Sequence, residues 1–188
     1  MHYQEYRLRT KIRELWSDTA CSIHLLIISK TNKTDDDADI LERLMIDQEE
    51  ISAVLKPYYD KEVVTELAEL LKENIYKTRD VIINTIDENT ELLTESKIDW
   101  YKNVNDISSF LFEVNAHIYN KNMKNMLLDY LDSIENILTS RMREDFNYEF
   151  IALNDTIQYT MMIADAISEA IIDEFQDKFR NNKLDVLM

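Results

Sequence analysis

The stretch LRTKIRELWSDTACSIHLLI, residues 8–27, decides the fold that the sequence predicts. Its apolar side chains recur at steps of three and four residues, which is the spacing of one face of an α-helix. The stripe consists of Leu8, Ile12, Leu15, Trp16, Ile23, Leu26 and Ile27, with Thr19 in the same register. We therefore expect a helix over about residues 3–30 that turns this face toward a core.

The same spacing continues along the chain and predicts five further helices. They cover about residues 37–56, 61–85, 90–114, 121–140 and 147–180, separated by short polar breaks and by Pro57. The last of them is apolar on more than one side, which predicts a central position in the molecule. Long helices with short connections are typical of an all-α, antiparallel up-and-down bundle, expected here as one domain over residues 1–188.

Two segments of the predicted bundle look like diverged copies of one unit. Residues 47–75 and residues 103–131 carry similar polar and apolar residues in the same order. This order predicts two pseudo-symmetric helical pairs. The alternative is that sequential helices share one apolar register by chance.

Composition excludes several other fold classes. The chain has no Gly and a single Pro, the residues that supply the tight turns of β-structure and of nucleotide-binding loops. Its 45% of hydrophobic and 31% of charged residues are typical of a folded globular protein rather than a disordered one. Asn and Asp adopt left-handed backbone next most readily after Gly, so we expect them to shape the turns between helices.

Charge and cysteine content bound the partners and the compartment. There are 21 Lys and Arg against 37 Asp and Glu, a net charge of −16, which disfavours binding to nucleic acid. No apolar run is long enough to span a bilayer, and no signal peptide follows Met1, so we expect no membrane partner. With Cys21 as the one cysteine, we expect a cytoplasmic protein. A sequence rich in Ile, Asn, Lys and Asp suits the AT-rich genome of a bacterium or a virus.

Residues for metal or acid–base chemistry are sparse. The three histidines, His2, His24 and His117, form no Glu-x-x-His pair of the kind that binds metals in helical bundles. We therefore expect no catalytic residue and no cofactor. The alternative is a metal-binding or redox bundle with an interior site built from carboxylates. The candidates for that site are Glu14, Asp18, Glu50, Asp106 and Asp165.

Polar residues within the apolar stripes mark a second kind of interior position. Thr19, Gln48, Asn74 and Tyr130 each lie on the apolar face of a predicted helix. We expect these four to be hydrogen-bonded groups that fix the register of the helices. Asp165 interrupts an apolar run and must be paired or neutral if it is buried.

Aromatic residues at helical spacing offer a third alternative, a small-molecule pocket inside the bundle. Its lining would be Trp16, Trp100, Tyr130 and Tyr159. Aromatic clusters at this spacing form core more often than they form pockets. We therefore rank this pocket below the other two interpretations.

Motifs in both halves of the chain carry a family resemblance. They are Leu15-Trp16, Arg43-Leu44, Gln48, Ile51, Pro57-Tyr58-Tyr59, Trp100-Tyr101-Lys102-Asn103, Ile107, Phe110-Leu111, Asn115, Met126-Leu127, Ile163-Ala164-Asp165, Phe175 and Phe179. In this order they resemble a family of uncharacterised, mostly bacterial helical-bundle proteins, over nearly the whole chain. Members of that family often carry enzyme names such as glycosyltransferase or acetylglutamate kinase. No nucleotide-sugar or ATP motif of this chain supports such a name.

The resemblance implies histidines at four positions where this chain has Thr19, Asn74, Tyr130 and Tyr159, and it implies a conserved Asp165. Histidines that met in the interior would form a metal site, whereas the residues found here are poor ligands for transition metals. The chain thus resembles a divergent member that keeps the scaffold. Our leading hypothesis is a non-enzymatic bundle that acts as an interaction or structural component, with a protein partner.

Overall fold

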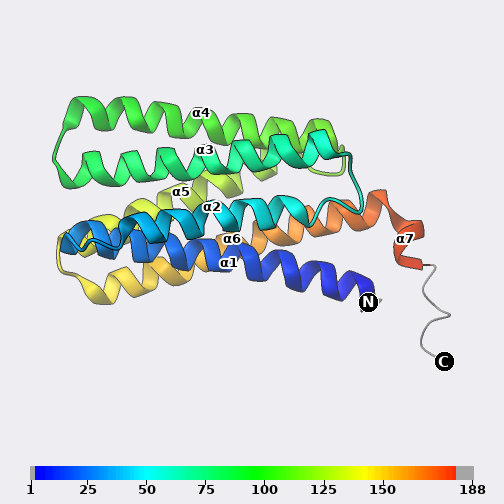
Figure 1. Ribbon diagram of the computed structural model, residues 1–188, viewed down its shortest axis with the longest axis horizontal. Helices are drawn as coiled ribbons and strands as arrows, with labels where there is room; N and C mark the ends of the chain where they lie inside the picture. The colour runs from blue at the N-terminus through cyan, green and yellow to red at the C-terminus, as the bar shows by residue number, and fades with distance from the viewer. Residues whose placement is uncertain (1–2, 181–188) are drawn as a thin grey trace.

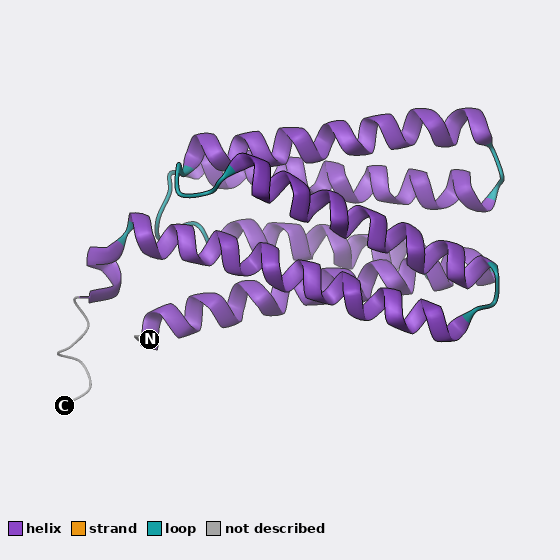
Figure 2. Cartoon of the chain, turned by 180° about the vertical axis from the view of Figure 1, so that it is seen from behind, coloured by secondary structure: helices purple, strands orange, loops and turns teal. Residues whose placement is uncertain are grey.

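The computed structural model describes residues 3–180, which form seven α-helices and no strand (Figure 1, Figure 2). The helices are α1 (Tyr3–Asn32), α2 (Asp37–Ala53), α3 (Lys61–Ile86), α4 (Thr90–Val114), α5 (Asn120–Met142), α6 (Phe146–Glu174) and α7 (Gln176–Arg180). The six long helices lie roughly side by side, alternate in direction and are joined by short turns (Figure 1). The described residues form the all-α bundle that the apolar periodicity predicts.

The order of the helices around the bundle follows their order in the chain, and α6 closes the ring beside α1. In addition, α1 packs against α3 and α5, so it contacts four other long helices and lies nearest the centre. By contrast, α6 packs mainly against α1 and α5. The predicted central position of the last helix is therefore wrong. Those apolar residues of α6 that neither α1 nor α5 covers are exposed at the surface.

One hydrophobic core extends along the bundle and takes side chains from every helix. Ile27 of α1, Ile82 of α3, Trp100 of α4 and Ile163 of α6 are each completely buried in it. Burying such a side chain contributes about 1.5–3 kcal/mol relative to leaving it in water. None of the described helices combines the length and the apolar character that crossing a membrane requires.

Three helices end in a left-handed residue although the chain has no Gly. Lys33, Glu88 and Glu144 have φ angles of 55°, 54° and 58° and follow α1, α3 and α5. After each of them, the next backbone N–H donates to a carbonyl five residues back, as in Asn89 N to Asn84 O at 3.1 Å. This bond satisfies a carbonyl that the helix end leaves open. Asn and Asp stand in these turns, as Asp87 and Asp145 do, but the left-handed residue of each turn is a Lys or a Glu.

The last predicted helix is broken near its end. Phe175, with φ −112° and ψ 38°, separates α6 from α7, which folds over the turn between α2 and α3. There Phe179 is buried, and its ring stacks on that of Tyr58 with centroids 5.7 Å apart. Phe175 lies edge-on to Tyr59 at 5.2 Å. These aromatic contacts fasten the end of the described chain to the turn at residues 54–60.

Candidate functional site

Side chains from the first five helices enclose a small cavity in the middle of the bundle. Thr19 of α1, Gln48 of α2, Asn74 of α3 and Tyr130 of α5 are all buried and line it together. The cavity has a volume of about 10 Å³. A single water molecule needs roughly 10–15 Å³. This cavity thus has room for no more than a water-sized molecule.

The side of this cavity between α1 and α2 is hydrogen-bonded. Gln48 Nε2 donates to Thr19 Oγ1 at 3.3 Å and to the Leu44 carbonyl at 3.1 Å. The Thr19 hydroxyl donates in turn to the carbonyl of Leu15 at 3.1 Å. A buried polar group is stable only where it finds a hydrogen-bond partner. These three hydrogen bonds therefore hold α2 in one register against α1.

A second hydrogen-bonded chain joins α3 to α4. Asn74 Nδ2 donates to Asn103 Oδ1 at 2.8 Å, and Asn103 Nδ2 donates to the Leu70 carbonyl at 3.1 Å. One turn further along, Trp100 Nε1 donates to the Thr78 hydroxyl at 2.9 Å. The sequence analysis missed Asn103 and Thr78, although each is a polar residue at an apolar register position. The same pattern, a polar residue at an apolar register position, is what identified Asn74.

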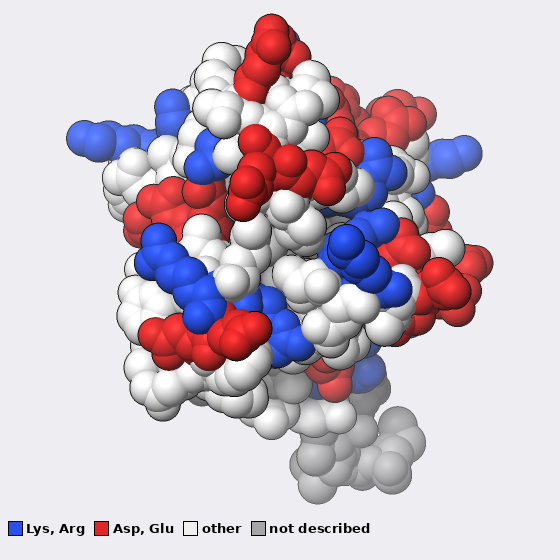
Figure 3. Space-filling view, turned by 90° about the vertical axis from the view of Figure 1, so that its left-hand side faces the viewer, with Lys and Arg blue, Asp and Glu red and all other residues white. Residues whose placement is uncertain are grey.

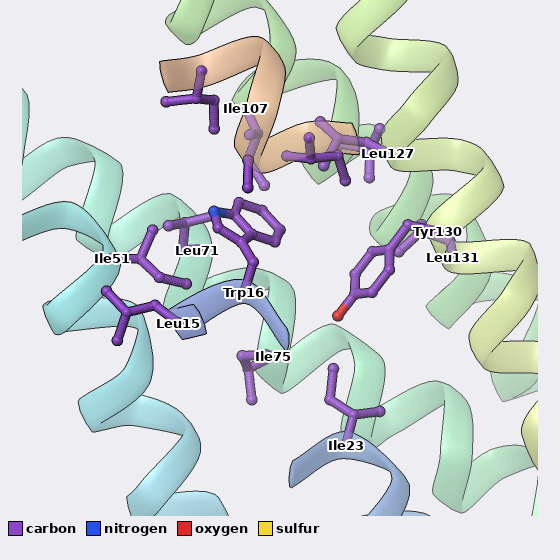
Figure 4. Close-up of a cluster of buried hydrophobic side chains, with 14 of the residues drawn as sticks. Leu15, Trp16, Ile23, Ile51, Leu71, Ile75, Ile107, Leu127, Tyr130 and Leu131 are labelled. Atoms are coloured by element: carbon purple, nitrogen blue, oxygen red, sulfur yellow. The ribbon is translucent and has the colours of Figure 1, made fainter. Parts of the chain in front are cut away.

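Two buried polar atoms of the cavity have no hydrogen-bond partner among the described residues. They are Trp16 Nε1 and the hydroxyl of Tyr130. The two rings meet edge to face with centroids 6.4 Å apart, and the Tyr130 hydroxyl points past Trp16 into the space between Ile75 and Ile23 (Figure 4). Burial raises the pKa of the Tyr130 phenol, so the group stays neutral. The residues that line the cavity include no Asp, Glu, His, Lys or Cys, so this lining offers no acid–base group that titrates near neutral pH.

The four aromatic residues of the third alternative do not line one pocket. Trp16 and Tyr130 line the cavity, whereas Trp100 packs between α3 and α4 and Tyr159 is a half-buried residue of α6. Of the four positions that the family resemblance assigns to histidine, Thr19, Asn74 and Tyr130 therefore meet at one point, and Tyr159 does not line that cavity. The cavity where these three residues meet is too small for a ligand larger than a water molecule.

The candidate carboxylates do not form an interior site. Glu14, Asp18, Glu50 and Asp106 are exposed, because an unpaired carboxylate is costly to bury. Asp165 is half-buried and takes two 2.6 Å hydrogen bonds from the Arg13 guanidinium. Within residues 3–180, no three His, Cys, Asp or Glu side chains are grouped so that they could hold a metal ion.

Two other carboxylates are buried, and the sequence analysis missed both. Asp47 of α2 is fully buried, with Oδ1 2.5 Å from Arg43 Nη2 and Oδ2 at a long 3.5 Å from the Ser22 hydroxyl. The Arg43 contact is close but poorly aligned for a hydrogen bond. Burial raises the pKa of Asp47 above its ordinary value, against the opposing charge of Arg43.

Glu149 is the second buried carboxylate and lies in the first turn of α6. His24 Nε2 is 2.6 Å from its Oε1, and Arg141 Nη1 is 3.4 Å from its Oε2. Arg141 also donates to Asn32 Oδ1 at 3.3 Å. The cluster ties together α1, α5 and α6 at the end of the bundle where α5 turns into α6.

The outer surface of α6 is the other candidate site. Five of its large apolar side chains are exposed, and we call them the α6 face: Phe146, Tyr148, Phe150, Ile151 and Met162. From Phe146 to Ala164 the charged residues are Glu149, which is buried, and Asp155. Leu25 of α1, next to His24 in the chain, is also exposed.

This surface contrasts with the rest of the molecule. The chain carries a net charge of −16. Acidic side chains form several groups at the end of the bundle that carries the α1–α2, α3–α4 and α5–α6 turns (Figure 3). Exposed apolar residues that stand alone need no explanation, whereas a contiguous apolar patch marks an interaction surface. Four of the five residues of the α6 face lie in the first two turns of α6, from Phe146 to Ile151, and Met162 lies about three turns further on.

Comparison of the chain with protein-family models, with curated proteins and with solved structures finds no match. The family resemblance therefore stays a prediction that rests on the motifs alone. What the protein does has to be inferred from its geometry, namely an interior cavity of water size and the exposed apolar residues of α6.

Proposed function

We propose that this protein is a non-enzymatic scaffold that acts by binding another protein through the α6 face. The observation that carries the proposal is the placement of α6 at the side of the bundle. Its second apolar side, with Phe150 66% exposed, is turned to solvent there. Exposed apolar surface is a cost for a protein that acts alone, whereas it becomes the apolar centre of an interface once a partner covers it.

The partner's chemistry follows from the surroundings of the α6 face. Aromatic residues and Met are enriched at the centres of protein interfaces, and three of the five residues of this face are aromatic. The net charge of −16 favours approach by a partner with basic residues. We therefore propose a partner with an apolar surface bordered by Lys or Arg. We also propose that the two proteins bind each other in the reducing cytoplasm.

Charge insertion into the α6 face tests this function. Phe150→Asp should abolish co-purification of the partner from native cells, while Ile98→Asp should leave it unchanged. Ile98 is the matched control because it is 63% exposed and lies on α4. Equal partner recovery with both variants would contradict the proposal. So would stoichiometric iron, manganese or zinc in the natively purified protein, since either result would place the function elsewhere.

A further inference from the structure

A groove lies at the opposite end of the bundle from the α1–α2 turn, between the start of α1 and the end of α2. It has a volume of about 530 Å³. Leu8, Val54, Pro57 and Tyr58 give it apolar walls, and Tyr6 stands exposed at its side. The groove is separate from the α6 face and from the interior cavity.

The charged residues that line the groove are two cations and the carboxylate of Glu14, although the molecule as a whole is acidic. Arg7 and Lys11 both line it. Lys11 is 3.6 Å from Glu14, whereas the Arg7 guanidinium lies over the ring of Tyr3 at 5.8 Å. Among the described residues, Arg7 has no carboxylate within 4 Å. An occupant with apolar side chains and one acidic group would match this lining.

The described chain ends beside this groove. Phe179 stacks on Tyr58, and Lys178 Nζ donates to the carbonyl of Pro57, so α7 lies against residues that form the groove wall. In Figure 1, α7 lies at the same end of the bundle as the start of α1. The segment that follows Arg180 therefore starts close enough to the groove that a few extended residues can reach it.

The sequence after Arg180 matches the lining. Residues 181–188 read NNKLDVLM and place Leu184, Val186, Leu187 and Met188 around the acidic Asp185. Eight extended residues span up to roughly 26–29 Å. A tethered segment needs only weak contacts, because its effective concentration at a nearby site is on the order of millimolar.

We propose that residues 184–188 dock in this groove of their own chain, with their apolar side chains against Leu8, Val54 and Tyr58. Asp185 then faces Arg7. The docked segment covers the groove and fastens the first turns of α1 to the turn between α2 and α3. Arg7 thereby gains a carboxylate partner, and the apolar walls are removed from water.

Paramagnetic relaxation in the full-length chain tests the docking. A nitroxide is attached to Thr10→Cys in a Cys21→Ser background, since Thr10 lines the groove and Cys21 is an exposed thiol. We expect loss of the amide signals of residues 184–188. The same label on Ile98→Cys of α4 should leave these signals intact. Intact signals with the Thr10 label would overturn the proposal.

Two variants and one mixing experiment separate the remaining outcomes. Leu187→Asp, at a position outside the described residues, should restore the amide signals while the circular dichroism spectrum of the bundle stays unchanged. Arg7→Glu should restore the signals in part. If Leu187→Asp leaves the signal loss unchanged, the docking is not through this segment. A mixture of labelled protein and isotope-enriched unlabelled protein should show no signal loss. Loss in that mixture would mean that a second copy fills the groove, which would contradict docking within one chain.

Discussion

His24 Nε2 and Glu149 Oε1 lie 2.6 Å apart, and this contact joins the middle of α1 to the first turn of α6. Glu149 is 3% exposed, so its carboxylate depends on His24 and on Arg141 of α5 for its partners. The contact fixes where α6 begins along α1. It thereby fixes which side of α6 is turned inward and which side, with Phe150 and Ile151, is turned to solvent.

Replacing Glu149 tests this cluster. Glu149→Gln should lower the free energy of unfolding by about 3 kcal/mol, because it leaves a partly buried cation without its counter-charge. Urea unfolding followed by circular dichroism measures the loss. Asp155→Asn is the control on the same helix, since Asp155 is exposed, and it should change stability by less than about 0.5 kcal/mol. Equal effects of the two substitutions would show that the cluster does not position α6.

The hydroxyl of Tyr130 should be dispensable. It is buried without a hydrogen-bond partner, so Tyr130→Phe should be neutral or raise the free energy of unfolding by about 1 kcal/mol. Thr78→Val should have the opposite effect and cost about 1–3 kcal/mol, because it leaves the Trp100 indole N–H unpaired in the core. Thermal or urea unfolding of both variants decides this. A large loss in Tyr130→Phe would mean that the phenol is bound inside the cavity.

Glycine should stabilise the end of α3. Glu88 has a φ of 54°, a conformation that costs an L-residue about 1–2 kcal/mol and glycine little. Glu88→Gly should therefore raise the free energy of unfolding by about 0.5–1 kcal/mol. The neighbouring Asp87 has a φ of −79°, so Asp87→Gly should lower it. If both variants are destabilised, the left-handed turn is not formed in solution.

Asp47 should make stability depend on pH in an unusual direction. Burial raises the folded-state pKa of Asp47 above 3.8, so the folded protein binds this proton more tightly than the unfolded chain. Arg43, Asp18 and Glu50 are the charges that act on it. As pH falls from neutral through the raised pKa toward 3.8, protonation of Asp47 adds stability. The difference in unfolding free energy between wild type and Asp47→Asn should shift in favour of wild type over that range. A difference that is constant with pH would contradict the raised pKa.

The periodicity of apolar residues was enough to predict the helices but not their neighbours. The stripe of α1 from Leu8 to Ile27 has the same spacing as that of α6, so spacing did not indicate that α1 lies nearer the centre of the bundle. Because α6 has apolar residues on more than one side, we predicted that it is buried. The sequence alone does not show how many other helices pack against it. The structure provides α1 and α5 as its main neighbours and leaves Phe150 in solvent.

The buried polar groups divide in the same way. Thr19, Gln48, Asn74 and Tyr130 interrupt apolar stripes, and this visible signal identified them before the structure did. Asp47 and Glu149 gave no such signal, because each is one of 37 acidic residues at positions that look like a solvated face. Their burial depends on the approach of α1 and α5, which local spacing does not encode.

A photo-reactive cross-linker at Phe150 tests the central claim most directly. With p-benzoylphenylalanine in place of Phe150, irradiation of native cells should give a defined adduct between the protein and one partner. The same cross-linker at Ile98, equally exposed on α4, should give no such adduct. Adducts of equal yield at both positions, or none at Phe150, would contradict a function that acts through the α6 face.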